Sequence, residues 1–422
     1  MATVQCWTGR EAKLLRQALR ETVRGFAEYL GVDARTVAKW EARAETITLL
    51  PDTQTLMDTA LRLADQNVRE RFQIGLSNID SATEIHVAKA PAEQSILPTL
   101  TDVSVDVSGG LTIAAVLGPD VTLAVMDDYA RSVIDRYEIE GPKQLTSEVL
   151  ALRRLSRELG RGICTTMGRA QLVGVCARQT ALLAYMSVNL GRFTEAQQYA
   201  VEASVLATAI NDRPLLAWIK GTQSFAAYHQ HRYDAALNLA SAGVRLAGGD
   251  AQRIRLLSNG VARAAGKLGK RHLVRQAVDE ALALVASTEG IAGITSCIDF
   301  EPYDWTRTAA NSATAYLSLG DYRRALDLTQ ALSGSVAASD SDWSRSLVHL
   351  DEASALTIGA NADLEHAAAL GMQALAASAT KPITSVKNRA GELAIKLRRR
   401  GATRAADAFG AALRDWQEYM PR

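Results

Sequence analysis

A short pattern that recurs about every forty residues constrains the fold of this 422-residue chain more than any other feature. In each clear copy a helical stretch ends at a short break, an aromatic residue follows, and Ala stands three positions later. The copies are Gly191-Arg192-Phe193 with Ala196, His231-Arg232-Tyr233 with Ala236, and Gly320-Asp321-Tyr322 with Ala325. An aromatic side chain fits between two helices, and a small Ala lets the next helix come close. The pattern therefore predicts a series of helix pairs.

Weaker copies start at Arg271, Leu364 and Thr403, with Ala367 and Ala406 following the last two. Repeated helix pairs at this spacing resemble the tetratricopeptide repeat, whose unit of about 34 residues is shorter. The resemblance implies an irregular α-solenoid over residues 121–422. A preceding helix, ended by Gly141-Pro142, and a second one over 145–159 would open this array.

In such solenoids the first helix of each pair lines a concave face that binds a ligand. Amides there suit a peptide backbone, and Arg suits a carboxylate or phosphate, so a peptide and a small anionic ligand are both expected. The alternative is that these side chains only make contacts between helices. Counted back from each repeat, the ligand-binding candidates are Arg178, Tyr185, Asn189, Trp218, Phe225, His229, Asn259, Arg263, Lys267 and Arg307, followed by His349 and Glu352.

Two further segments of the array leave alternatives open. The longest gap between repeats contains 296–305, which is rich in aromatic and acidic residues and could be a lid, a dimer contact or a filler at a change of curvature. Lys387, Arg389, Lys396, Arg398, Arg399, Arg400 and Arg404 form a basic cluster near the end of the chain. We expect this cluster to be a solvated helix face, with added phosphate contact as the alternative.

Residues 8–43 carry apolar side chains at helical spacing in three successive segments, which predicts three short helices around one small core. Thr22 can cap the second helix, because its hydroxyl can accept an N–H of the first turn. Gly31 ends that helix, since Gly adopts the left-handed backbone without a Cβ clash. Asp33 caps the third helix, so a tight turn joins the second and third helices.

This segment resembles the Cro/C1-type (XRE) helix-turn-helix family of DNA-binding regulators. The matching positions are Thr22, Phe26, Ala27, Leu30, Gly31, Val32, Asp33, Thr36, Val37, Trp40 and Glu41. The resemblance implies that the third helix enters the major groove of double-stranded DNA, with Ala34, Arg35 and Lys39 at base-reading positions and Thr36 near a phosphate. It also implies an ion pair between Arg16 and Glu41.

The chemistry of these side chains agrees with such a role. Arg35 can present two parallel donors to guanine, and Lys39 lies one turn further along the same face. Thr22 and Arg24 could meet phosphate at the start of the second helix. The alternative is that all of them are ordinary solvated side chains on a three-helix bundle.

Between the two patterned regions, a further helix from Asp52 or Thr53 is expected to extend the first domain to residue 76. Residues 77–120 contain Pro, Gly, Ser and Thr without helical period, which is typical of a linker. The net charge of the whole chain is only +1. Residues 8–43 carry a modest excess of positive charge, which favours a dimer that doubles the phosphate contacts.

Motifs that carry catalysis are absent from the sequence: it has no phosphate-binding GxxxxGK loop, no GxGxxG, no HExxH and no GxSxG. Cys6, Cys164, Cys176 and Cys297 have no metal-binding spacing and are expected to be reduced thiols in the core. His229 and His231 are two residues apart and cannot share a metal from one helix face. We expect no enzyme activity, no cofactor, and a cytoplasmic protein without a membrane span.

The sequence thus predicts an all-α protein. Residues 1–76 form a helix-turn-helix DNA-binding domain, 77–120 a linker, and 121–422 a tetratricopeptide-like domain for sensing and dimerisation. This order resembles bacterial peptide-sensing regulators and implies a homodimeric, ligand-responsive transcriptional regulator. The rival interpretation is a protein-interaction scaffold in which DNA binding is secondary or lost.

Overall fold

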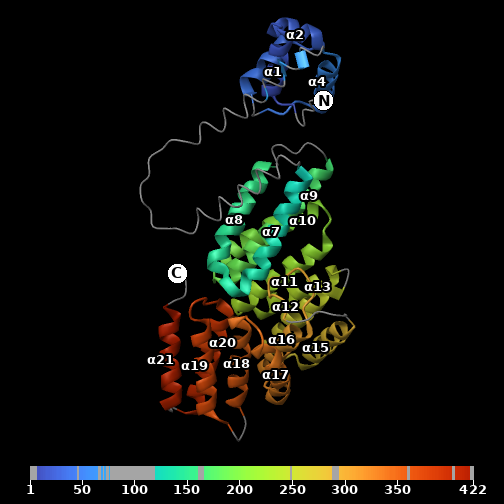
Figure 1. Ribbon diagram of the computed structural model, residues 1–422. Coiled ribbons are helices and arrows are strands. Elements are labelled where there is room, and N and C mark those ends of the chain that lie inside the picture. The colour runs from blue at the N-terminus through green and yellow to red at the C-terminus, as the bar shows by residue number, and fades with distance from the viewer. Residues whose placement is uncertain are drawn as a thin grey trace, which may run out of the picture. The chain divides into compact units, whose positions relative to one another are not determined.

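The computed structural model describes residues 7–44, 47–64, 68–69, 71–72, 76, 119–159, 166–247, 250–287, 294–358, 362–401 and 404–418. These residues are helical apart from their connections and one isolated β-bridge between Thr8 and Thr48. The all-α prediction is therefore confirmed. The predicted linker was 77–120. Residues 77–118 lie outside the described residues, and the last two residues of the predicted linker belong to a helix that begins at Pro119. The chain separates into two compact units, which are described one at a time (Figure 1).

In the described part of the first unit, the helices with defined bounds are α1 (Gly9–Leu19), α2 (Val23–Leu30), α3 (Ala34–Arg43) and α4 (Pro51–Leu63). Leu15, Phe26, Val37 and Met57 are fully buried in one common core. Each of these side chains comes from a different helix. The small core predicted from the apolar spacing is thus shared by all four elements.

The predicted boundaries of α2 and α3 are confirmed by their caps. The Thr22 hydroxyl accepts a hydrogen bond from the N–H of Gly25 at 3.0 Å, and the Asp33 carboxylate accepts one from Arg35 at 2.7 Å. Gly31 ends α2 with a φ of 72°, in the left-handed region that favours glycine. These three residues set the short turn between the two helices.

The start of α4 differs from the prediction. We expected Asp52 or Thr53 to cap it, but the helix begins at Pro51 after Leu50, without a side-chain cap. Proline suits the first helical position because the N–H it lacks would have no partner inside the helix.

The second unit opens with α7 (Pro119–Glu140) and α8 (Pro142–Leu159), separated by Gly141 with a φ of 89°. The break at Gly141-Pro142 is confirmed, and α7 begins two residues before the predicted domain start. The following elements are α9 (Thr166–Asn189), α10 (Phe193–Ala209), α11 (Arg213–His229), α12 (Tyr233–Leu246), α13 (Asp250–Arg255), the π-helix η2 (Leu256–Ala262) and α14 (Arg263–Lys267). The remaining ones are α15 (Arg271–Ala286), α16 (Trp305–Ser318), α17 (Tyr322–Ala337), α18 (Asp342–Leu356), α19 (Leu364–Ser378), α20 (Thr384–Arg400) and α21 (Arg404–Gln417).

The repeated sequence pattern marks where the second helix of a pair begins. Phe193, Tyr233, Arg271, Tyr322 and Leu364 are the first residues of α10, α12, α15, α17 and α19. The Ala three positions after each aromatic or Leu is at most 2% exposed. The break before four of these helices has a left-handed residue, namely Gly191, His231, Gly269 and Gly320. The chain reverses direction at these points because the left-handed residue ends one helix and lets the next start.

In the second unit, helices near the end of the series contact helices near its start. α18 to α21, orange to red in Figure 1, pack side by side. From there α20 reaches helices far earlier in the chain: the Thr384 hydroxyl donates to the carbonyl of Asn189 at 3.0 Å, and Lys267 pairs with Glu392 at 2.6 Å. The inner helices therefore meet around a common interior.

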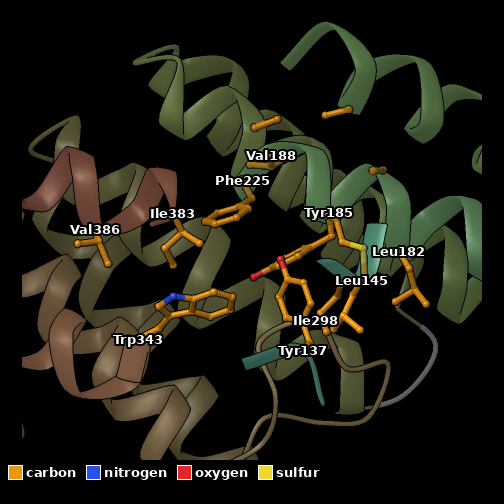
Figure 2. Packing of buried hydrophobic residues seen from close by; sticks show 14 of the residues in the cluster. Tyr137, Leu145, Leu182, Tyr185, Val188, Phe225, Ile298, Trp343, Ile383 and Val386 are labelled. Atoms are coloured by element: carbon orange, nitrogen blue, oxygen red, sulfur yellow. The ribbon is translucent and has the colours of Figure 1, made fainter. Parts of the chain in front are cut away.

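Aromatic side chains fill much of this interior (Figure 2). Tyr137 of α7 packs against Trp343 of α18 with 5.4 Å between ring centroids, and Tyr185 of α9 stacks on Phe225 of α11 at 5.2 Å. The first contact joins α7 to α18, far along the chain, and the second joins the inner helices α9 and α11.

Candidate functional site

In the first unit, α3 presents two cations to solvent. Arg35 and Lys39 are exposed and lie one helical turn apart, and neither forms an ion pair with a described residue. Ala34 and Thr36 beside them are half-buried. The other face of α3 holds the helix in the core through Val37 and Trp40. The helix can therefore present these side chains to a partner without leaving its core.

The two candidates on α2 are placed differently from each other. Thr22 is exposed and is engaged as the helix cap. Arg24 is exposed and lies 3.7 Å from Glu28, one turn further along the same helix. Such an exposed pair is weak, so the guanidinium of Arg24 can exchange Glu28 for another anion at little cost.

The ion pair between Arg16 and Glu41 is present. The Nε of Arg16 lies 2.6 Å from one carboxylate oxygen and Nη2 lies 3.0 Å from the other, and both side chains are largely buried. Arg16 also donates to the carbonyl of Glu21 at 2.8 Å. A two-point pair of this kind fixes the end of α3 relative to α1.

In the second unit, the interior contains two neighbouring cavities. The larger one has a volume of about 140 Å³ and lies among α11, α14, α16, α18 and α20. The smaller one, of about 50 Å³, has room for a few water molecules. Arg263, Ser385 and Arg389 line both cavities.

Most of the ligand-binding candidates line these cavities. Tyr185, Asn189, Phe225, Asn259, Arg263 and Arg307 line the smaller cavity, and His229, Arg263 and Lys267 line the larger one. They come together because each stands on the inner helix of its pair. Counting back from the repeat thus found the inward-facing side chains.

Arg178 and Trp218 lie elsewhere, and so do His349 and Glu352, which line neither cavity. Arg178 pairs with Asp127 of α7 at 2.7 Å. Trp218 is fully buried, and its indole N–H donates to the carbonyl of Asp299 at 2.7 Å. Arg178 and Trp218 therefore make contacts within the fold, which was the alternative interpretation of the ligand-binding candidates.

Segment 296–305 fills the interior. The carbonyl of Asp299 in this segment accepts the hydrogen bond from Trp218, and the Ser296 hydroxyl donates to the carbonyl of Ile134 at 3.3 Å. Tyr303 is 1% exposed, and it and Cys297 line the smaller cavity. Of the three expectations for this segment, filling agrees with these contacts.

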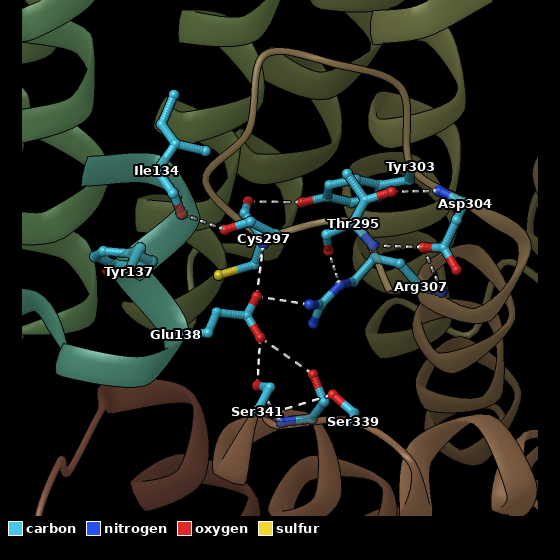
Figure 3. Close-up of polar contacts among 12 residues, drawn as sticks. Ile134, Tyr137, Glu138, Thr295, Cys297, Tyr303, Asp304, Arg307, Ser339 and Ser341 are labelled. Carbon is cyan, nitrogen blue, oxygen red and sulfur yellow. Dashed lines mark hydrogen bonds and ion pairs between the residues drawn. The ribbon is translucent and has the colours of Figure 1, made fainter. Parts of the chain in front are cut away.

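A buried acid beside this segment joins three parts of the unit (Figure 3). Glu138 of α7 accepts from Arg307 of α16 at 2.6 Å, from the backbone N–H of Cys297 at 2.7 Å, and from the hydroxyl of Ser341. Burial alone would raise the pKa of Glu138, but Arg307 and these donors lower it below its ordinary value. Arg307 is therefore neutralised by a carboxylate and is not available to a ligand.

Arg389 and Lys396 on α20 are residues whose position the sequence interpretation missed. We expected them on a solvated face, but both line the larger cavity, and only 14% of the Arg389 side chain is exposed. A signal was present: Ser385, Arg389, Glu392 and Lys396 are spaced as one helical stripe. A polar stripe between buried positions indicates a polar interior.

Charge in the larger cavity is unbalanced. Four cations line it, namely Arg263, Lys267, Arg389 and Lys396, against the two acids Asp351 and Glu392. His229 adds no charge, because burial and the neighbouring cations, Arg263 first among them, keep its pKa well below the ordinary value. The cavity wall therefore carries an excess of two positive charges.

No group of His, Cys, Asp and Glu that could hold a metal ion occurs in the described part of the chain. None of the described helices is long and apolar enough to cross a membrane. No protein-family model matches this chain, and no curated protein is significantly similar to it.

Proposed function

We propose that this protein is a sequence-specific DNA-binding transcriptional regulator, whose first unit reads the major groove with α3. The observation that carries the proposal is the exposed pair Arg35 and Lys39 on a helix whose opposite face and end are fixed by Trp40 and by the Arg16–Glu41 pair. A base-reading helix needs both properties: free donors on one face and a rigid attachment on the other.

Helix order in this unit supports the same role. α2 ends at left-handed Gly31 and α3 starts after the Asp33 cap, so the two helices are joined by a very short turn. In helix-turn-helix proteins the second helix of this pair enters the major groove with its N-terminal residues near the bases. Arg35 stands in the first turn of α3, which is the position such a role requires.

In this proposal the second unit is a tetratricopeptide-like domain that responds to a ligand and forms a homodimer. The second helices of its pairs begin at the repeat markers, and most of the ligand candidates lie around its interior cavities. A ligand that binds one shape of the dimer more tightly would change the distance between the two copies of α3. That distance must match DNA half-sites one helical turn, or a multiple, apart.

Selection from a random duplex library with the full-length protein tests the proposal, because the selection itself identifies the operator. The enriched sequence is then titrated by fluorescence anisotropy. We expect Arg35→Ala to weaken binding about 5- to 150-fold, corresponding to the loss of one two-point base contact. Lys13→Ala removes an exposed cation from α1 and should weaken binding much less.

The salt dependence of the same titration separates DNA recognition from adventitious binding. The affinity should fall steeply as salt rises, because phosphate contacts release counterions. A library that yields no enriched sequence, or an enriched duplex that Arg35→Ala binds as tightly as the wild type does, would remove the regulator and favour the interaction scaffold.

A further inference from the structure

The larger cavity in the second unit contains a buried arginine without a carboxylate partner. Arg263 is 4% exposed and lies over the ring of Tyr228 at 4.4 Å. One guanidinium nitrogen donates to the side-chain oxygen of Asn259, and Nε has no hydrogen-bond partner. No described acid forms an ion pair with Arg263. Arginine remains charged in proteins, so this is an uncompensated charge inside the fold.

A second cation of the same cavity is also unpaired. Lys396 forms neither a hydrogen bond nor an ion pair with the described residues. Burial lowers the pKa of Lys396, while Glu392 and Asp351 act in the opposite direction. Both acids are already engaged, because Glu392 lies 2.6 Å from Lys267 and Asp351 lies 2.7 Å from Arg389.

Arg389 completes the set of donors. Its Nη1 is held by Asp351 and by the carbonyl of Leu347, but its Nε is buried without a partner. Burial and the neighbouring Arg263 both act to lower the pKa of Arg389. Three cations from α14 and α20 thus surround one space with unused hydrogen-bonding capacity.

The helix that carries Asn259 and Arg263 has an unusual backbone. Residues Leu256–Ala262 form a π-helix, a rare conformation that is found frequently at functional sites. Within it Gly260 lies directly against Ala240, where an added Cβ would be only 2.6 Å from the Ala240 Cβ. The π-helix ends directly before Arg263, and its Asn259 lines the smaller cavity, which shares Arg263 with the larger one.

Buried like charges cost folding free energy unless something compensates them. Inside this cavity the compensation that fits is an anion with several acceptor oxygens, because guanidinium groups bind carboxylate and phosphate strongly. The volume of about 140 Å³ is near that of a cavity that holds benzene, so the ligand has only a few non-hydrogen atoms. A cavity of this volume is too small to hold an extended peptide.

We infer that the larger cavity binds one small oxyanion per chain, a phosphate-type or a short carboxylate anion, through Arg263, Arg389 and Lys396. That this site controls DNA binding is a claim that rests on the proposed function. That the cavity binds an anion at all is a claim that rests only on the cavity and its charges.

Calorimetric titration of the full-length protein without DNA tests the site. The probes are sodium phosphate, sodium sulfate, sodium acetate and sodium succinate at constant ionic strength, with sodium chloride as the reference. We expect saturable binding of at least one probe, one per chain, with a Kd below about 1 mM. The two inorganic anions and the two carboxylates distinguish the two sources of the same chemistry.

Lys396→Met is the decisive variant, because it keeps most of the unbranched side chain and removes an unpaired charge. Without anion, its melting temperature should equal or exceed that of the wild type, whereas its affinity for the anion should fall at least about tenfold. Arg263→Met should weaken binding in the same way. Lys220→Met removes a half-buried lysine that lines neither cavity and should leave the affinity unchanged.

If none of the probes binds, or if Lys396→Met and Arg263→Met bind them as tightly as the wild type does, the site is refuted. Repeating the DNA titration with the anion that binds tests control separately. If the anion binds and Lys396 is required, the site is supported whatever the DNA titration shows. If DNA binding does not change when the anion is added, only the control of DNA binding by the ligand is contradicted.

Discussion

Two arginines of the first unit, Arg16 and Arg24, form ion pairs in very different surroundings. Arg16 reaches Glu41 through two nitrogens, and 16% and 12% of the two side chains are exposed. Arg24 and Glu28 are 86% and 74% exposed and are 3.7 Å apart. Solvent screens the second pair and hardly the first.

We therefore expect Arg16→Ala to lower the free energy of unfolding of the first unit by about 2 kcal/mol, since it removes charged hydrogen bonds from a mostly buried site. Arg24→Ala should cost less than about 0.5 kcal/mol. Urea titration followed by tryptophan fluorescence measures both, because Trp7 and Trp40 lie in this core. Equal losses for the two variants would contradict the assignment of Arg16 as a structural residue.

In the second unit, Glu138 has the role that Arg16 has in the first unit, because it forms a buried ion pair between two helices. Glu138→Gln leaves Arg307 buried without a charge partner, so we expect the unit to lose about 3 kcal/mol at neutral pH. Glu140→Gln on the same helix is the control, because its partner Arg136 keeps Glu148 and both side chains of the pair are partly exposed. The control should lose less than about 1 kcal/mol.

The effect of pH on Glu138→Gln has a definite sign. In the folded protein the pKa of Glu138 lies below its ordinary value of 4.5. Its contribution to stability is therefore complete above about pH 4.5 and is lost as the pH falls through the folded-state pKa. The difference between wild type and variant, measured by urea titration at several pH values, should narrow as the pH falls below 4.5. A constant difference would contradict the lowered pKa.

At the scale of the element, two glycines differ in how closely their helix approaches a neighbouring helix. In α14 a Cβ on Gly266 would lie 2.6 Å from the backbone oxygen of Ala315 in α16. In α17 a Cβ on Gly334 would meet nothing within 4 Å. The first glycine is required by a close approach of two backbones, and the second is not.

We expect Gly266→Ala to destabilise the second unit by about 1–3 kcal/mol, because a backbone atom must move. Gly334→Ala should stabilise it by up to about 1 kcal/mol, because Ala is the better helix former. Thermal unfolding followed by circular dichroism compares the two. The same sign for both substitutions would show that the helix packing at Gly266 is looser than described.

Helix boundaries could be predicted well because they depend on few neighbouring residues. Thr22, Gly31 and Asp33 act within one turn of backbone, and the residue before each second helix needs only a left-handed conformation. The direction that α20 faces could not be predicted in this way. Its basic residues are compatible with a solvated face, and only contact with α11, α14 and α18 assigns Arg389 and Lys396 to the interior.

At the scale of the whole molecule, the chain has separate hydrophobic cores. Among the described residues, the core cluster around Phe26 and Val37 is built from residues between 7 and 76, and the two largest clusters of the second unit are built from residues after 128. Units with separate cores can unfold in separate cooperative steps. We expect calorimetry to resolve two transitions, of which Arg16→Ala shifts one and Glu138→Gln shifts the other. A single transition that both substitutions lower would contradict this separation.

The sequence by itself determined the all-α class, the caps of α2 and α3, and the starts of the second helices in each pair. Most of the side chains that it singled out as ligand-binding candidates line the interior cavities, because the repeat fixes which helix of a pair is the inner one.

Only the tertiary structure decided that the array closes and that its interior consists of small charged cavities. Closure depends on small rotations between successive pairs that add up along the chain, and no local pattern encodes their sum. For that reason Arg178 and Trp218 were expected beside a ligand and lie in contacts between helices, whereas Lys396 was expected in solvent and lines the same cavity as Arg263.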